Sequence, residues 1–135
     1  MTSQPEITRL LHVSLLVHDL ARARQFYEQV LGLSPSPLRP QLGFAGVWYD
    51  VGEQQIHLLT GAAPGQISND GAPGGRDRHI AFAVANLEQL VSTLKEHEIA
   101  FTRSASGRRA LFCRDPEGNA LEFSELSSTP AMRPS

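Results

Sequence analysis

Four residues with metal-binding side chains recur at matched positions in two halves of this 135-residue chain. His12 and His57 belong to the first half, and His79 and Glu122 take the equivalent places in the second. Three imidazoles and one carboxylate are a natural ligand set for a divalent ion, with Ni, Zn, Co, Mn and Fe all chemically reasonable. The sequence therefore predicts a metal centre built from these four residues.

Any one of the four residues taken alone has an ordinary explanation. An isolated strand histidine is more often a hydrogen-bonded core residue than a metal ligand. Glu122, between Leu121 and Phe123, is costly to bury without a partner, but that partner need not be a metal. The symmetric recurrence of all four residues favours one shared metal over four separate roles.

The surrounding pattern predicts an α+β fold made of one βαβββ unit written twice. In the first copy, strands are expected at residues 10–17, 43–51 and 54–59, with the three prolines of 34–40 marking an irregular or edge segment. In the second copy, strands are expected at residues 79–84, 99–103, 109–114 and 120–125. Asp19 and Asn86 are the expected N-caps of one helix in each copy.

These elements predict a division of the chain into four segments. The first βαβββ module covers residues 8–60, a linker rich in glycine and proline covers 61–78, the second module covers 79–126, and a flexible tail covers 127–135. A half-size module cannot bury both faces of its sheet, so the modules should pack on each other or on a second chain.

Composition narrows the possible partners. A net charge of -2 gives no reason to expect nucleic acid, and no apolar run is long enough for a membrane span. The N-terminus lacks a signal-peptide pattern. The single cysteine, Cys113, cannot form an internal disulfide, which favours a cytoplasmic protein. Because it follows Phe112 in an expected strand and has no Cys-x-x-Cys partner, it is expected to be a small packed residue.

Two stretches carry a resemblance to a known superfamily. The first is His12-Val13-Ser14-Leu15-Leu16-Val17-His18-Asp19-Leu20, and the second is Asp115-Pro116-Glu117-Gly118-Asn119-Ala120-Leu121-Glu122-Phe123. With these motifs the chain resembles the vicinal oxygen chelate superfamily. Its short length, the closing Glu122 and the segments 74–79 and 106–108 most resemble glyoxalase I-like (lactoylglutathione-lyase-like) proteins. The resemblance implies paired modules that form a cup-shaped mixed sheet with helices outside.

The resemblance also implies a function and roles for particular residues. The expected protein is a divalent-metal lyase or isomerase, often a homodimer, in which the metal chelates two vicinal oxygens of a small substrate and Glu122 moves the proton. Glyoxalase I has a glutamate where this chain has His57, and a glutathione-binding arginine where it has Leu16. Arg76, Arg78 or Arg108 could supply an anion contact to the substrate instead.

Two other functions within the superfamily fit the same residues. His12, His79 and Glu122 form a two-histidine, one-carboxylate set, which suits a non-haem iron extradiol-type dioxygenase. A protein of the bleomycin-resistance kind would instead sequester a ligand without a metal. Metal content and oxygen uptake separate these alternatives.

Overall fold

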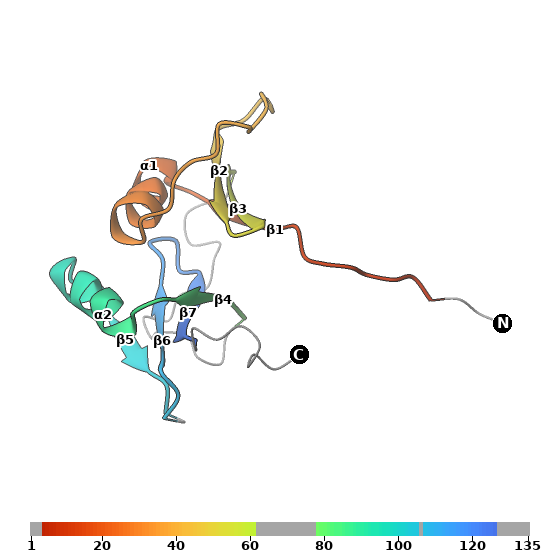
Figure 1. Cartoon of the computed structure of the whole chain (residues 1–135). Helices are drawn as coiled ribbons and strands as arrows, with labels where there is room; N and C mark the ends of the chain where they lie inside the picture. Colours follow the sequence, from red (N-terminus) through yellow and green to blue (C-terminus); the bar gives the residue numbers. More distant parts are fainter. Residues whose placement is uncertain (1–3, 62–77, 106, 127–135) are drawn as a thin grey trace. The chain divides into compact units, whose positions relative to one another are not determined.

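The computed structural model describes residues 4–61, 78–105 and 107–126 of the chain. The chain divides into two compact units, Met1–Gly61 and Ala62–Ser135, and in each unit helical turns lie on one side of a sheet (Figure 1). The predicted α+β fold class is confirmed. Apart from Gly61 and Arg78, the predicted linker lies outside the described residues, as does the predicted tail.

The sheet of the first unit has the strand order β1-β3-β2. β1 (His12–Val17) runs parallel to β3 (Gln54–Thr60), and β2 (Gly46–Val51) runs antiparallel to it. Gly52 joins β2 to β3 with a φ of 61°, a left-handed conformation that glycine adopts without steric cost. In this order β3, which carries His57, is the central strand.

The helical segment of the first unit changes its winding part of the way along. Asp19 caps α1 (Leu20–Arg24) by accepting the Arg22 N–H at 3.0 Å, and the chain then continues as a π-helix, η1 (Gln25–Val30). The expected helix is thus present, but hydrophobic spacing gives no signal of the wider turns. Its buried side chains, which face the apolar side of the sheet, are Ala23, Phe26 and Tyr27.

The first unit differs from the predicted βαβββ pattern by one strand. Residues 32–45, all of which the structure describes, form no strand, and Pro35 makes only a single antiparallel bridge to Tyr49. Proline has no N–H to donate to a strand ladder, and Pro35, Pro37 and Pro40 occupy this segment. The segment therefore passes along the edge of β2 without extending the sheet.

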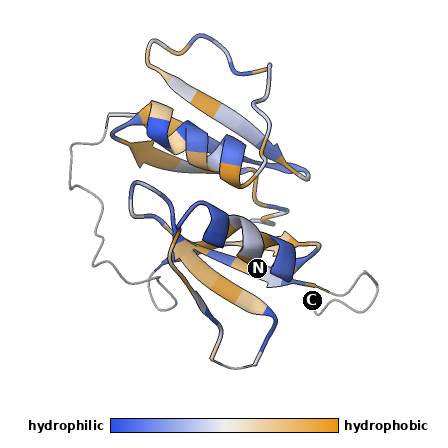
Figure 2. Ribbon diagram, turned by 90° about the vertical axis from the view of Figure 1, so that its left-hand side faces the viewer, coloured by the Kyte–Doolittle hydropathy of each residue, from blue (hydrophilic) through white to orange (hydrophobic). Residues whose placement is uncertain are grey.

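The second unit has the complete pattern, with strand order β4-β7-β6-β5. Its strands are β4 (His79–Val84), β5 (Phe101–Arg103), β6 (Ala110–Arg114) and β7 (Ala120–Glu125). Asn86 caps α2 (Leu87–Glu96), whose buried residues are Leu87, Val91 and Leu94. Figure 2 shows the strands of this unit largely in hydrophobic colours. It shows α2 with both hydrophilic and hydrophobic residues, as expected for a helix that covers a sheet.

The repeat predicted from the sequence is present in the strand register. His12 is the first residue of β1, and His79 is the first residue of β4. Two residues later in each strand, Ser14 pairs with His57 and Ala81 pairs with Glu122. The two units therefore place a histidine and a second polar residue at equivalent points of two parallel strand pairs.

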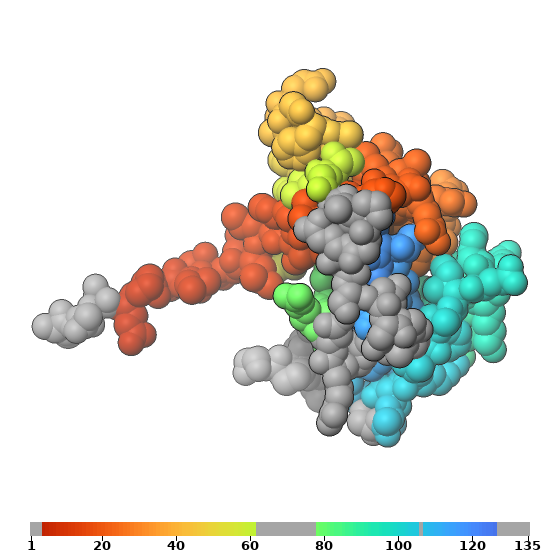
Figure 3. All heavy atoms as spheres, turned by 180° about the vertical axis from the view of Figure 1, so that it is seen from behind, coloured from red at the N-terminus to blue at the C-terminus, as the bar shows by residue number. Residues whose placement is uncertain are grey.

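Residues 4–11 precede β1 as an extended arm, seen in Figure 3 as a red segment. The side chains of Ile7, Leu10 and Leu11 are exposed along it. Within the residues that the structure describes, none of the helices has the length and hydropathy of a membrane span.

Candidate functional site

One face of the first unit's sheet is apolar, and the other carries both polar and apolar side chains. Side chains alternate between faces along a strand, and residues paired across strands share a face. The face toward the helix carries Val47, Tyr49, Ile56 and Leu58, all buried. The opposite face carries the predicted ligands His12 and His57.

His57 lies between two other rings on this opposite face. The Trp48 indole, directly opposite in β2, is stacked on one side with centroids 4.1 Å apart and an interplanar angle of 2°. The His12 imidazole is stacked with it at 4.0 Å and 14°. These contacts leave His57 only 7% exposed. The ring is therefore held by its neighbours in one orientation.

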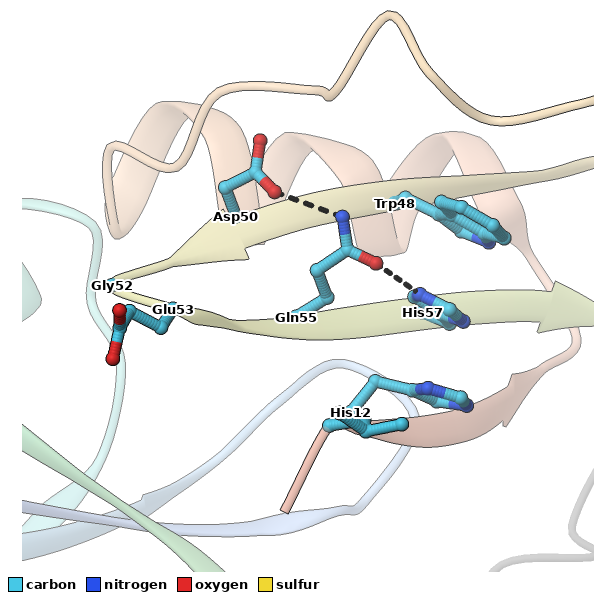
Figure 4. Close-up of a pocket in the computed structure, with 8 residues that line it drawn as sticks. His12, Trp48, Asp50, Gly52, Glu53, Gln55 and His57 are labelled. Atoms are coloured by element: carbon cyan, nitrogen blue, oxygen red, sulfur yellow. Dashed lines mark hydrogen bonds between the residues drawn. The ribbon is translucent and has the colours of Figure 1, made fainter. Parts of the chain in front are cut away.

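Gln55 and Asp50 extend the site along the same face. His57 Nε2 lies 2.8 Å from Gln55 Oε1, and Gln55 Nε2 donates to Asp50 Oδ1 at 2.8 Å (Figure 4). Burial lowers the pKa of His57, and the charges of His12 and Arg39 lower it further, which favours a neutral imidazole. A pocket of about 560 Å³ opens here, lined by Leu11, His12, Trp48, Asp50, Gly52, Glu53, Gln55 and His57.

Glu122 is the corresponding polar residue of the second unit. It is 8% exposed and lies between Ala81 of β4 and Phe112 of β6. Its Oε1 is 3.0 Å from His79 Nε2, and its Oε2 accepts hydrogen bonds from Arg108 Nη1 at 3.1 Å and Ser124 Oγ at 3.2 Å. The carboxylate is thus buried with partners, as the cost of burying an isolated charge requires.

The turn before β7 fixes the register that positions Glu122. Asp115 is buried, and its Oδ1 accepts the backbone N–H groups of Glu117 and Asn119 at 2.9 and 2.8 Å. Gly118 has a φ of 94°, which a residue with a Cβ rarely adopts. The Asp-Pro-Glu-Gly-Asn motif therefore helps to position Glu122 by fixing the turn of the β6–β7 hairpin.

The structure brings the predicted site residues together in two pairs. His12 contacts His57 in the first unit, and His79 contacts Glu122 in the second, where Arg108 also reaches the carboxylate. Within the described part of either unit, no three His, Cys, Asp or Glu side chains are grouped as a metal site would require. Arg78 is exposed just before β4, and Arg76 lies outside the described residues.

The donor chemistry of these pairs fits a divalent ion, because it consists of imidazole nitrogens and a buried carboxylate. Neutral imidazole is the form that binds metals, and the lowered pKa of His57 favours it. The lone pair of an imidazole nitrogen lies in the plane of its ring. Because the rings of His12 and His57 are stacked in nearly parallel planes, their nitrogen lone pairs do not point at one common position in this arrangement. His12 is the exposed member of the pair.

Sequence reasoning missed the residues that surround the predicted ligands. Trp48, Gln55 and Asp50 contact His57 or each other, and Ser124 contacts Glu122. A signal was available, because a tight turn at Gly52-Glu53 fixes the hairpin register and places Trp48 opposite His57.

Comparisons with known proteins give a family and several relatives of this chain. The family model described as Glyoxalase/Bleomycin resistance protein/Dioxygenase superfamily matches residues 9–123. The lactoylglutathione lyase of Escherichia coli O157:H7 is 30% identical over 128 residues, covering 87% of this chain and 92% of that protein. The mitochondrial methylmalonyl-CoA epimerase of Bos taurus is 34% identical over 99 residues, which cover 67% of this chain and 55% of the epimerase.

Solved structures show the same fold at lower sequence identity. The trypanothione-dependent glyoxalase I of Leishmania major superposes with a TM-score of 0.68 at 23% identity, covering 88% of this chain and 87% of that one. A lactoylglutathione lyase from Agrobacterium tumefaciens superposes with a TM-score of 0.62 at 22% identity, covering 90% of this chain and 96% of that one.

Proposed function

Because this chain belongs to the Glyoxalase/Bleomycin resistance protein/Dioxygenase superfamily, we propose that it is a divalent-metal-dependent enzyme of the glyoxalase type. The reaction would be a proton transfer, of the lyase or isomerase kind, on a small oxygenated substrate. The observation that carries the proposal is the Glu122 carboxylate, buried in β7 with the imidazole of His79 at 3.0 Å. A buried carboxylate beside a histidine is a common feature of sites that move protons or hold metals.

His12, His57, His79 and Glu122 would hold the ion. When bound, the ion would act as a Lewis acid that polarises two vicinal oxygens of the substrate and acidifies the neighbouring C–H. Family membership and the donor chemistry of the two pairs support this ligand set. The identity of the metal, among Ni, Zn, Co, Mn and Fe, is left to the experiment.

Glu122 would take and return the proton as general base and acid. In the chain as described, His79 engages Oε1, while Arg108 and Ser124 engage Oε2. These donors fix the orientation of the carboxylate, so that one oxygen can remain held while the other takes the proton. Arg108 is exposed as well as bonded to Glu122, which suits a side chain that also meets an anionic group of the substrate.

The thiol part of a glyoxalase-type substrate is a separate question. Leu16, on the same face of the first sheet as His57, is 42% exposed, and a leucine cannot pair with a carboxylate. We therefore infer that glutathione, if it is used, is held by other residues. Comparing hemithioacetals of glutathione with those of small neutral thiols tests this inference directly.

The experiment that tests the proposed function combines metal analysis with a substrate screen. Purified protein is repleted with each candidate metal, analysed for bound ions, and assayed on thiol hemithioacetals, acyl-CoA esters and catechols. Isomerisation or epimerisation that depends on bound metal supports the proposal. Iron with oxygen uptake on catechols would support the dioxygenase alternative, and tight ligand binding without metal would support a sequestering protein.

Two further expectations accompany the proposed function. We infer that the protein is a homodimer, since the exposed Ile7, Leu10 and Leu11 of the N-terminal arm offer apolar surface for a second copy. A cytoplasmic location stays a prediction from the single cysteine.

A further inference from the structure

Gln55 links His57 to Asp50 in a short hydrogen-bonded chain across the first sheet (Figure 4). The strand register builds this chain, because Gln55 and His57 are two residues apart on one face of β3 and Asp50 is paired with Gln55 from β2. Both links are 2.8 Å long. Three polar side chains on two neighbouring strands are therefore connected in a fixed order.

The direction of each hydrogen bond follows from the chemistry of Asp50. A carboxylate at neutral pH can only accept, so Gln55 turns its NH₂ group toward Asp50 and its carbonyl oxygen toward His57. An amide oxygen also only accepts, so His57 must donate from Nε2. In a neutral imidazole the proton is then on Nε2, and the lone pair is on Nδ1.

The stacked rings prevent the imidazole from changing this arrangement freely. Trp48 lies parallel to one face of His57 at 4.1 Å, and His12 lies against the other at 4.0 Å. A half-turn of the His57 ring, which would exchange the positions of its two edges, must first open this stack. The ring is consequently held both by hydrogen bonding at its edge and by contact on its faces.

We propose that Gln55 and Asp50 are positioning residues that hold His57 in the Nε2–H tautomer, so that Nδ1 is the atom it offers to a divalent ion. Histidines that bind metals commonly donate their other ring N–H to a neighbouring acceptor, and loss of that acceptor typically weakens metal binding by about 10–100-fold. The role toward the ion rests on the proposed function, whereas the tautomer is a property of the metal-free chain.

The first test reads the tautomer in metal-free protein, by long-range proton–nitrogen NMR spectra of protein labelled with ¹⁵N-histidine. His57 is expected to show a protonated Nε2 and an unprotonated Nδ1. In Gln55→Leu the two nitrogens should become more alike, because both neutral tautomers are then populated. Gln54→Leu is the matched control, since Gln54 is an exposed neighbour in β3 on the other face, and it should leave His57 unchanged.

A paired exchange separates positioning from simple support of the fold. The double variant Asp50→Asn/Gln55→Glu keeps one amide and one carboxylate, and it restores an acceptor for the His57 Nε2–H. It should return the Nε2–H tautomer that Gln55→Leu loses. A purely structural role predicts instead that thermal stability changes while the His57 nitrogen signals do not.

The second test measures affinity for Zn²⁺ and Ni²⁺ by titration of the same variants. Gln55→Leu should bind more weakly by about 10–100-fold, and the double variant should recover most of that loss. An Nδ1–H tautomer or an imidazolium in the unmodified protein at pH 7.5 overturns the proposal, as does a Gln55→Leu variant with unchanged nitrogen signals and affinity. Protein that shows the expected tautomer but binds none of Ni, Zn, Co, Mn and Fe on repletion overturns the metal role together with the proposed function.

Discussion

Replacing Glu122 with glutamine keeps the size of the side chain but removes its ability to take a proton. Three donors meet the carboxylate in the structure, from His79 at Oε1 and from Arg108 and Ser124 at Oε2. The amide retains only one oxygen, so its NH₂ group must face at least one of these donors. Loss of one hydrogen bond to a charged group costs about 1.5–3 kcal/mol, partly offset because a buried charge is removed.

The expected loss of turnover is larger than this loss of stability. Removing a general base typically lowers a rate by about 10²–10⁴-fold, which corresponds to about 3–5 kcal/mol in the activation barrier. The Glu122→Gln protein should therefore remain folded and keep its metal, more weakly bound, while turnover falls by that factor. Circular dichroism melting, metal analysis and steady-state kinetics on the substrate found by the screen measure the three quantities.

Glu125→Gln is the matched control for this variant. Glu125 belongs to the same strand but points to the other face, where it accepts from Arg109 and from the Leu87 N–H at the start of α2. Its replacement should reduce stability modestly and leave metal content and turnover intact. The reasoning is refuted if Glu122→Gln holds its metal and keeps full turnover, because the proton must then be moved by another group.

Four other outcomes are expected. Repletion with the physiological divalent metal should raise the melting temperature, since an ion that binds only the folded state stabilises it by mass action; an unchanged melting curve at saturating metal would contradict this. Tyr49→Phe should lower the free energy of unfolding in urea by about 1–3 kcal/mol, because the buried Tyr49 hydroxyl donates to Glu28 at 2.8 Å. An unchanged unfolding midpoint would count against that hydrogen bond. Burial raises the pKa of Cys113 to about 12, so its thiol should react with a disulfide reagent at pH 8 only after denaturation. Fast reaction of the native protein would show instead that the thiol is accessible. Light scattering at micromolar concentration should give the mass of a dimer, and a monomer would rule out the proposed homodimer.

The sequence predicted the strands that carry the candidate site residues, and where those strands begin, since both depend on local sequence patterns. His12 and His79 stood out because each opens a strand and the two strands are followed by similar caps and helices. Glu122 stood out because a carboxylate interrupts an apolar strand. Such signals lie within a few residues of the chain and need no knowledge of which strands are neighbours.

The contacts around those residues depend on pairing between strands and were not predicted. Trp48 reaches His57 only through the β2–β3 register, and Arg108 reaches Glu122 from the loop before β6. The first unit lacks the fourth strand of the βαβββ pattern for a local reason, the loss of backbone donors at the prolines of 34–40, which had already marked that segment as irregular or an edge. The π-helical turns also escaped prediction, because their buried residues keep nearly the same spacing as in an α-helix.

The ring stack on the first sheet provides the protein with an internal optical reporter. Trp48 is the chain's only tryptophan, and its indole is in parallel contact with the imidazole of His57. Indole emission responds to the groups that touch the ring, so any event that turns or displaces His57 should change the intrinsic fluorescence of the whole protein. Binding of an ion or a substrate that turns His57 should therefore be detectable in real time on unlabelled protein, with no contribution from a second tryptophan.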